Sequence, residues 1–448
     1  MAQVVIMGAG RGAVPWANPM RKRLGAVLAV ALVVCAPVRA QTLEQAWRIA
    51  AAHDRALAAA ADDVQAARSS AKAARAGRWP SIRSQASYTR FGQTPELDVV
   101  TPASALRSGP IFKNDQYVSA SVQVRLPLYS GGAIRNDIDA ARAGLKGASA
   151  TERAVSADVK LEVAEAYVAV LRAQRALGVT RESVTSLAAH VRDVQAKYQR
   201  QAVAKSDLLA ARVALANARE QEVAADNALA IARASYDRLL GAPLDRVPHL
   251  DPRLPVFSVD SLPLAALLAR ALHSRQELQA LGARAAALAA RARVADASRL
   301  PHIAAIGGYT HFDNQILNHE NFSMVGLGFT WKLFDGGAAA SEADALRARS
   351  RAERQRLADL RSRIELAVRA AWLQLAAARA QIEASRAATA QAAENLRISR
   401  ELYRVGLASN TQVLEAVTLR AEAARNYDDA RLDAGLDRLR LAYAVGAL

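Results

Sequence analysis

The chain has 448 residues and a formal net charge of +17, and hydrophobic residues make up 52% of it although aromatic residues make up only 5%. Alanine supplies much of the apolar content, which favours closely packed helices over one large globular core. Basic residues are interspersed with Asp and Glu, as in the segment Asp158–Glu162. Solvated helix faces therefore explain the charge better than a nucleic-acid-binding stripe.

The first 40 residues have the features of a secretory signal peptide. A basic cluster at 21–23 precedes an apolar run at 24–36, and small residues suitable for cleavage follow at 38–40. The apolar run is too short for a permanent membrane helix, which needs about 20 residues. We expect the mature chain to begin near Gln41.

Two further expectations concern this segment. Met20 stands directly before the basic cluster and is a candidate start, in which case residues 1–19 are a mis-assigned extension. The only cysteine, Cys35, is an alternative site for a lipid, but the bulky Val34 before it disfavours lipidation. The mature chain then has no cysteine and needs no disulfide in its oxidising compartment.

The remainder of the chain contains an internal repeat of about 205 residues. Glycine pairs, tyrosines and prolines recur at fixed offsets. The matches are Gly131-Gly132 with Gly336-Gly337 and Tyr198 with Tyr403 at an offset of 205, and Pro80 with Pro301 at an offset of 221. A unit this long indicates a duplicated half-protein and not a solenoid. We predict a first structural repeat at 41–250, a linker at 251–261 and a second repeat at 262–448.

Each repeat is expected to hold a helix, two strands, and two further helices joined by a turn. No proline occurs at 128–242 or at 302–448, and proline breaks helix interiors. We therefore predict uninterrupted helices at Ala133–Tyr198 and Ala338–Tyr403, each of 66 residues. Each would be about 100 Å long, which fits a coiled-coil or tubular assembly and not an ordinary globular domain.

Two short segments alternate between apolar and polar residues. They are Val118–Leu126 and the stripe Val325, Leu327, Phe329, Trp331 and Leu333, with partner strands expected to start at Pro80 and Pro301. A period of two gives a strand one apolar and one polar face. Taken alone, the pattern also fits a half-buried sheet in a soluble domain.

Two features favour strands that cross a membrane. The segments reach the roughly 9–11 residues that a tilted strand needs to span a bilayer, and no apolar run after the signal is long enough for a membrane helix. Tyr129 and Phe334 lie at equivalent strand ends, where membrane barrels place an aromatic girdle. Four strands cannot close a barrel, so copies must assemble, and three copies are the smallest assembly with room for a pore.

A set of sequence marks occurs in the same order in both repeats. Besides the strand starts, they are Pro127-Leu-Tyr-Ser-Gly-Gly132, Leu333-Phe-Asp-Gly-Gly337 and Tyr403-Arg-Val-Gly-Leu-Ala-Ser-Asn-Thr-Gln-Val-Leu-Glu-Ala416. With these marks, residues 42–448 resemble the TolC-like outer membrane efflux proteins, also called outer membrane factors. Each mark is weak alone, but their repeated order is specific.

The resemblance implies a mainly α fold with a small membrane β-barrel. Three copies would form a twelve-stranded barrel in the outer membrane that continues into a twelve-helix tunnel across the periplasm. The homotrimer would be the passive exit duct of a tripartite efflux or type I secretion system. A periplasmic adaptor (membrane fusion) protein would join it to an inner-membrane pump of the RND, ABC or MFS type. The resemblance implies contact with outer-membrane lipid, and it implies no catalysis, cofactor, metal or nucleic acid.

The same resemblance implies that the turns after Tyr198 and Tyr403 are the periplasmic tips of the tunnel. The residues that would dock the adaptor are Gln201, Ala202, Val203, Val405, Gly406 and Leu407. The residues that would close a periplasmic gate are Asp207, Tyr403, Gln412 and Glu415.

Two positions of this gate depart from the family pattern. Gln412 and Glu415 match an acidic ring, so one acid is kept and one is replaced by an amide. They are one helical turn apart and share a face, although an exposed carboxylate near a helix start explains Glu415 equally well. The arginine expected near Ala408 is absent, and Arg404 is its candidate replacement.

Two other classes of protein account for less of the chain. A periplasmic coiled-coil adaptor or scaffold without a barrel explains the helices but not the duplicated alternating strands. An enzyme would need a recurring acid, base or nucleophile constellation, and His302, His311 and His319 lie at loop-like spacings unlike a compact metal motif. The transported substrate stays open among drugs, metal ions and secreted polypeptides.

Overall fold

The computed structural model describes residues 40–101, 104–314 and 317–448. The predicted signal peptide therefore lies outside the described residues, apart from Ala40. The described part of the chain contains these helices and strands: α1 (Leu43–His53), α2 (Arg55–Ala76), β1 (Ser81–Arg90), β2 (Glu96–Thr101), β3 (Ser104–Pro110), β4 (Gln116–Tyr129), α3 (Ala133–Gln199), α4 (Lys205–Leu240), the 3-10 helix η1 (Ser258–Ser261), α5 (Leu264–Ser274), α6 (Gln276–Ala297), β5 (His302–Phe312), β6 (Asn321–Thr330), α7 (Ala338–Arg404) and α8 (Asn410–Ala444).

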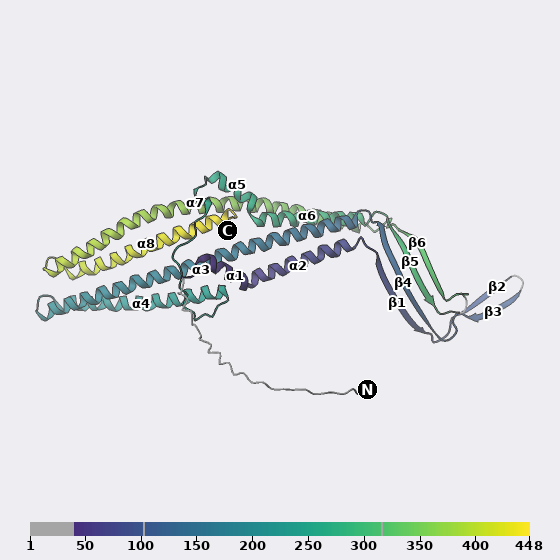
Figure 1. The fold of residues 1–448 in the computed structure, drawn as a ribbon, viewed down its shortest axis with the longest axis horizontal. Helices are drawn as coiled ribbons and strands as arrows, with labels where there is room; N and C mark the ends of the chain where they lie inside the picture. The colour runs from purple at the N-terminus through teal and green to yellow at the C-terminus, as the bar shows by residue number, and fades with distance from the viewer. Residues whose placement is uncertain (1–39, 102–103, 315–316) are drawn as a thin grey trace, which may run out of the picture. The chain divides into compact units, whose positions relative to one another are not determined.

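The two predicted long helices are confirmed. Both α3 and α7 run without interruption for 67 residues, and each folds back through a short turn against the next helix, α4 or α8 (Figure 1). Each begins directly after a glycine pair with positive φ, and at Gly131 a Cβ atom would lie 2.6 Å from the Cβ of Leu300. Only glycine fits this close, left-handed turn between a strand and a helix.

The expected single helix at the start of each repeat is wrong, because each is broken into two helices. The break lies at Asp54 between α1 and α2 and at Arg275 between α5 and α6, and both residues have extended backbone angles. At the first break, the Asp54 carboxylate accepts a hydrogen bond from the Leu57 amide at 2.7 Å and caps α2. At the second, the Arg275 guanidinium donates to the carbonyl oxygen of Tyr443 at 2.9 Å. A side-chain cap thus begins the new helix at Asp54, whereas at Arg275 a hydrogen bond to α8 accompanies the break.

Four strands form one antiparallel sheet in the order β1-β4-β5-β6. The central pair, β4 and β5, joins the first repeat to the second, with Val122 opposite Tyr309. Two details of the sequence prediction are wrong. First, β6 ends at Thr330, so Trp331 and Leu333 follow the strand, and the Trp331 indole instead donates to the carbonyl oxygen of Arg299 at 3.0 Å. Second, the longer connection of the first repeat holds an additional hairpin, β2–β3.

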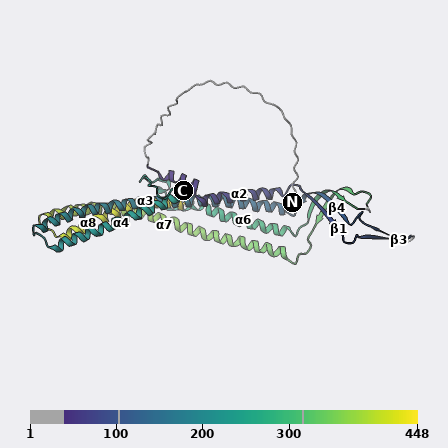
Figure 2. The same cartoon turned by 90° about the horizontal axis from the view of Figure 1, so that it is seen from below.

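The helices next to the sheet continue its strand order. α2, α3, α6 and α7 lie side by side through the contacts α2–α3, α3–α6 and α6–α7 (Figure 2). Each of them connects directly to one strand, because β1 follows α2, β4 leads into α3, β5 follows α6 and β6 leads into α7. Toward the end of the molecule that lies away from the sheet, α3 packs against α8 instead of α6.

The largest apolar core lies around the middle of α3. α1 packs there against α3 and α4, and Leu43, Tyr167 and Tyr236 are fully buried. The two tyrosine rings meet edge to face with centroids 5.9 Å apart, and burial raises the pKa of both phenols. The Tyr167 hydroxyl lies 2.7 Å from the carbonyl oxygens of both Gln41 and Asp251, so it connects the N-terminal segment to the segment between the repeats.

These two tyrosines provide a matched pair of substitutions. Tyr167→Phe should lower the free energy of unfolding by about 1 to 2 kcal/mol, because the half-buried carbonyl groups of Gln41 and Asp251 lose their hydroxyl partner. Tyr236→Phe should change it by less than about 0.5 kcal/mol, since the Tyr236 hydroxyl is buried without a hydrogen-bond partner among the described residues. Thermal unfolding of the detergent-solubilised variants measures both, and equal losses would contradict this assignment.

Candidate functional site

One face of the four-stranded sheet carries exposed apolar side chains from every strand. They are Ile82 and Tyr88 of β1, Val118, Val122 and Val124 of β4, Tyr309 of β5, and Val325, Leu327 and Phe329 of β6. The strand register places them on one side, since Tyr88 is opposite Val118 and Leu327 is opposite Ala305. Val325 is 93% exposed. A monomer in water rarely exposes so continuous an apolar surface, so this face needs a cover.

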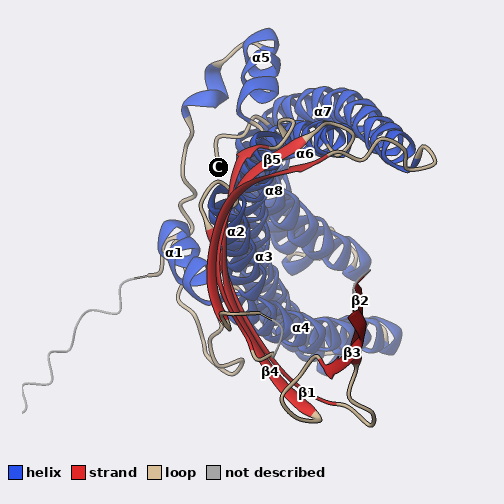
Figure 3. Cartoon of the chain, turned by 90° about the vertical axis from the view of Figure 1, so that its right-hand side faces the viewer, coloured by secondary structure: helices blue, strands red, loops and turns tan. Residues whose placement is uncertain are grey.

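The sheet also has two open edges. β1 and β6 each pair with only one strand among the described residues, and the sheet curves without closing on itself (Figure 3). An open edge leaves a row of backbone N–H and C=O groups in need of partners. Among the described residues, none of the helices combines the length and apolar content needed to cross a bilayer.

The second candidate region lies at the far ends of the helices, where the turns α3–α4 and α7–α8 are found (Figure 1). Side chains from all four helices form one apolar cluster there, which consists of Val194, Leu208, Ala211, Tyr403 and Val413. We call this region the tip. The cluster holds the two helical hairpins together at their ends.

A buried polar network lies beside this cluster. His190 of α3 is 3% exposed, and its Nε2 atom lies 2.8 Å from Oδ1 of Asn410. The Asn410 amide in turn donates to the carbonyl oxygen of Asp207 at 3.1 Å, and the His190 ring meets the Tyr403 ring edge to face at 5.1 Å. Burial lowers the pKa of His190, partly offset by its hydrogen bond to Asn410. His190 is therefore neutral at pH 7 and donates to Asn410 from Nε2.

A lysine adds a second link between the hairpins. The Lys197 ammonium lies 4.4 Å from the centroid of the Tyr403 ring. It also donates to the carbonyl oxygens of Tyr403 and Arg404, the latter at 3.2 Å. A cation is favoured beside the last carbonyl groups of a helix, which carry partial negative charge. Lys197 of α3 thus caps the end of α7.

The structure brings only part of the predicted gate together. Tyr403 is buried and Asp207 is half-buried, but no hydrogen bond joins their side chains among the described residues, and the Tyr403 hydroxyl has no hydrogen-bond partner there. The side chain of Gln412 accepts a hydrogen bond from the Ser409 amide at 2.8 Å, so it completes the capping box of α8. Glu415 is exposed one turn further along. Arg404, the candidate replacement, pairs with Glu401 at 3.7 Å.

The two tip turns have the same backbone but different surfaces. Gln201 has a φ of 57° and Gly406, at the repeat-equivalent position, has a φ of 84°. The α7–α8 turn exposes two apolar side chains, Val405 at 68% and Leu407 at 78%. In the α3–α4 turn Gln201 and Ala202 are exposed, whereas Val203 packs against the tip cluster.

Three residues of the tip were missed by the sequence analysis: His190, Lys197 and Asn410. At an offset of 205 they correspond to Asn395, Leu402 and Lys205. Positions at which the two repeats have different polar residues were therefore the sequence signal for these contacts. A hydrogen bond between the two hairpins joins two different side chains, so the two repeats need not have the same residue there.

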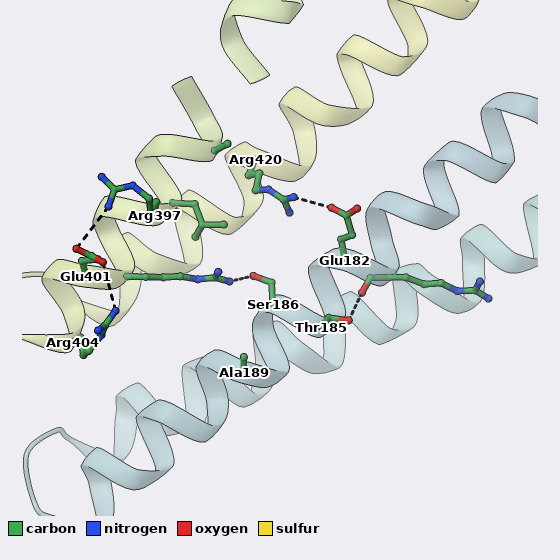
Figure 4. A pocket seen from close by; sticks show the side chains of 12 residues that line it. Glu182, Thr185, Ser186, Ala189, Arg397, Glu401, Arg404 and Arg420 are labelled. Carbon is green, nitrogen blue, oxygen red and sulfur yellow. Dashed lines mark hydrogen bonds and ion pairs between the residues drawn. The ribbon is translucent and has the colours of Figure 1, made fainter. Parts of the chain in front are cut away.

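A groove between α3 and α7 lies next to the tip and is lined by five arginines (Figure 4): Arg181, Arg397, Arg400, Arg404 and Arg420. Their charges are largely balanced by neighbours. Arg420 pairs with Glu182 of α3 at 2.9 Å, Arg397 pairs with Glu394 at 2.7 Å, and Arg181 pairs with Glu222 at 3.2 Å. Arg400 keeps its charge and donates a hydrogen bond to the neutral Ser186 hydroxyl. This groove therefore links the two hairpins and adds little free positive charge.

The buried histidine predicts a pH-dependent tip. A histidine whose pKa is lowered by folding binds fewer protons in the folded state, so stability falls as the pH falls through its ordinary value of 6.5. Thermal unfolding should therefore occur at lower temperature at mildly acidic pH than at neutral pH. This loss should be smaller in His190→Gln, which cannot titrate, and unchanged in the control His53→Gln, because His53 is exposed. An identical pH profile for His190→Gln and the parent would contradict the assignment.

Comparisons with known proteins agree with this architecture. The family model described as "Outer membrane efflux protein" matches residues 47–242 and 267–447. The outer membrane protein TolC of Vibrio cholerae is 24% identical over 363 residues, which cover 79% of this chain and 82% of that protein.

Two solved structures have the same fold. VceC, an outer membrane protein of Vibrio cholerae, superposes on this chain with a TM-score of 0.77 at 19% sequence identity. The match covers 90% of this chain and 96% of the VceC chain. CusC superposes with a TM-score of 0.77 at 18% sequence identity, and the match covers 90% of this chain and 92% of the CusC chain. Both therefore contain the sheet and the long helical hairpins in one chain.

Proposed function

The chain belongs to the family of outer membrane efflux proteins and is an outer-membrane efflux channel, and from this premise we propose that three copies form the exit duct of a tripartite efflux or type I secretion system. The family consists of channels and not of enzymes. The duct is a passive conduit, and the energy for export comes from a pump in the inner membrane.

The sheet carries this proposal, because its apolar face and its two open edges need partners at the same time. In lipid every backbone polar group must be satisfied within the protein, which leaves a closed barrel as the arrangement for strands. Two copies would give eight strands and an interior filled by side chains. Three copies of the four-stranded sheet give twelve strands and leave a lumen.

The helices extend the duct into the periplasm. α2, α3, α6 and α7 follow the strand order, so a closed ring of strands continues into a closed ring of helices. Toward the tip, α4, α3, α8 and α7 give four helices per copy and twelve per trimer. The membrane-facing surface is then confined to the strands, and the tip points away from the membrane.

The tip is the proposed gate and docking site. Of the four proposed gate residues, Tyr403 belongs to the tip cluster, and Asp207, Gln412 and Glu415 lie near the starts of α4 and α8. A periplasmic adaptor would dock on the turns at 201–203 and 405–407, where Val405 and Leu407 offer exposed apolar contacts. The pump would be of the RND, ABC or MFS type.

A periplasmic scaffold without a barrel is the competing proposal, and membrane fractionation separates the two. We expect the mature protein to stay with outer membranes after a high-salt wash and to be cross-linked as a trimer in intact cells. A protein that is released by salt, or that purifies as a monomer without detergent, would refute the duct.

Glu415 provides a test of the gate alone. Glu415→Ala should weaken the preference of the channel for cations in planar bilayers, because it would remove three carboxylates from the proposed gate of the trimer. The control is Glu220→Ala, which removes an exposed carboxylate of α4. If the reversal potential stays the same in Glu415→Ala, Glu415 is not part of the gate, whereas the duct itself is unaffected by that result.

A further inference from the structure

The polar face of the sheet has a charge of one sign only. Opposite the apolar face, β1 presents Arg83, Gln85 and Ser87, and β4 presents Ser119, Ser121, Gln123 and Arg125. The strands β1, β4, β5 and β6 contain no Asp or Glu at all. On this face β6 presents Met324, Gly326 and Gly328. The only fully charged side chains of the polar face are therefore Arg83 and Arg125.

These arginines differ from the charges at the outer ends of the strands, because no acidic side chain pairs with them among the described residues. At the outer ends of the strands, Arg90 pairs with Asp115 at 3.0 Å and Lys113 pairs with Glu320. Neither Arg83 nor Arg125 forms an ion pair or a side-chain hydrogen bond among the described residues. Both side chains are exposed.

The register also brings the two arginines close to each other. Arg83 is opposite Gln123, and Arg125 is two residues further along the same face. Diagonal neighbours of this kind in an antiparallel pair lie about 7 to 8 Å apart, and like charges there repel. Water and anions relieve that repulsion, whereas a lipid surface would not. The pair is therefore compatible with the barrel face that is in contact with the aqueous lumen.

We infer that Arg83 and Arg125 form a positively charged collar inside the barrel, which makes this section of the duct favour anionic solutes over cationic ones. The inference rests on the proposed trimer, in which three copies supply six unpaired arginines to one ring. Rings of arginine or lysine give pores a preference for anions. The collar is separate from the tip, where the gate carries carboxylates.

The size of the barrel decides where this effect is measurable. Twelve strands about 4.8 Å apart and tilted by about 40° give a backbone radius of about 12 Å. The Debye length is about 30 Å at 0.01 M salt and about 3 Å at 1 M. The field of the collar should thus fill the lumen at low salt and reach little beyond the arginine side chains at high salt.

The test measures the ratio of chloride to potassium permeability from reversal potentials in planar bilayers. The double variant R83Q/R125Q is compared with the parent, both carrying Glu415→Ala so that the tip carboxylate does not obscure the barrel. At about 0.01 M potassium chloride, R83Q/R125Q should lower the ratio about twofold or more, and the difference should vanish near 1 M.

The matched control is R83K/R125K, which keeps the charge but changes the shape of the side chain. It should retain the parent ratio. An unchanged ratio in R83Q/R125Q, or an equal loss in R83K/R125K, would overturn the collar. Either result would come from channels that insert and conduct, so the duct would stand. If the parent itself forms no trimer and no channel, the proposed function fails instead.

Discussion

The need of every sheet edge for a hydrogen-bonding partner is the constraint on which the rest of this structure depends. One copy offers four strands, an exposed apolar face and two open edges, β1 and β6. Lipid supplies no hydrogen bonds, so only neighbouring copies can satisfy these edges. In a membrane, trimerisation and a central lumen are then consequences of this one requirement. The long helices follow, because each is continuous with a strand whose position in the ring is already set.

The duplication has a direct structural use. β4 of the first repeat pairs with β5 of the second, and α3 packs against α6 in the same order. Each chain thereby supplies two similar wall segments joined by covalent connections, so three chains are enough for a ring of six segments. The repeats still differ where they serve different partners, as at the turns with Gln201 and Gly406.

The two ends of the duct have different chemistry. The barrel carries unpaired arginines and no acid on its strands, whereas the tip buries His190 and Asn410 and exposes Glu415. The tip joins its hairpins through an apolar cluster, the contact of His190 with Asn410 and the contacts of Lys197, and the neighbouring groove adds the ion pair of Arg420 with Glu182.

The sequence alone determined the features that depend on local pattern. Proline-free, alanine-rich segments defined α3 and α7 almost to the residue, and alternation placed β4 and β6 and their apolar faces, although it extended β6 beyond its end at Thr330. The helix break at Asp54 and the additional β2–β3 hairpin were not predicted. Neither produces a periodic pattern of apolar residues in the sequence. The unpaired arginines and the contact of His190 with Asn410 were decided by tertiary structure. Residues far apart in the sequence come into contact only through strand register and helix packing. The local sequence pattern of a single segment predicts neither the register nor the packing.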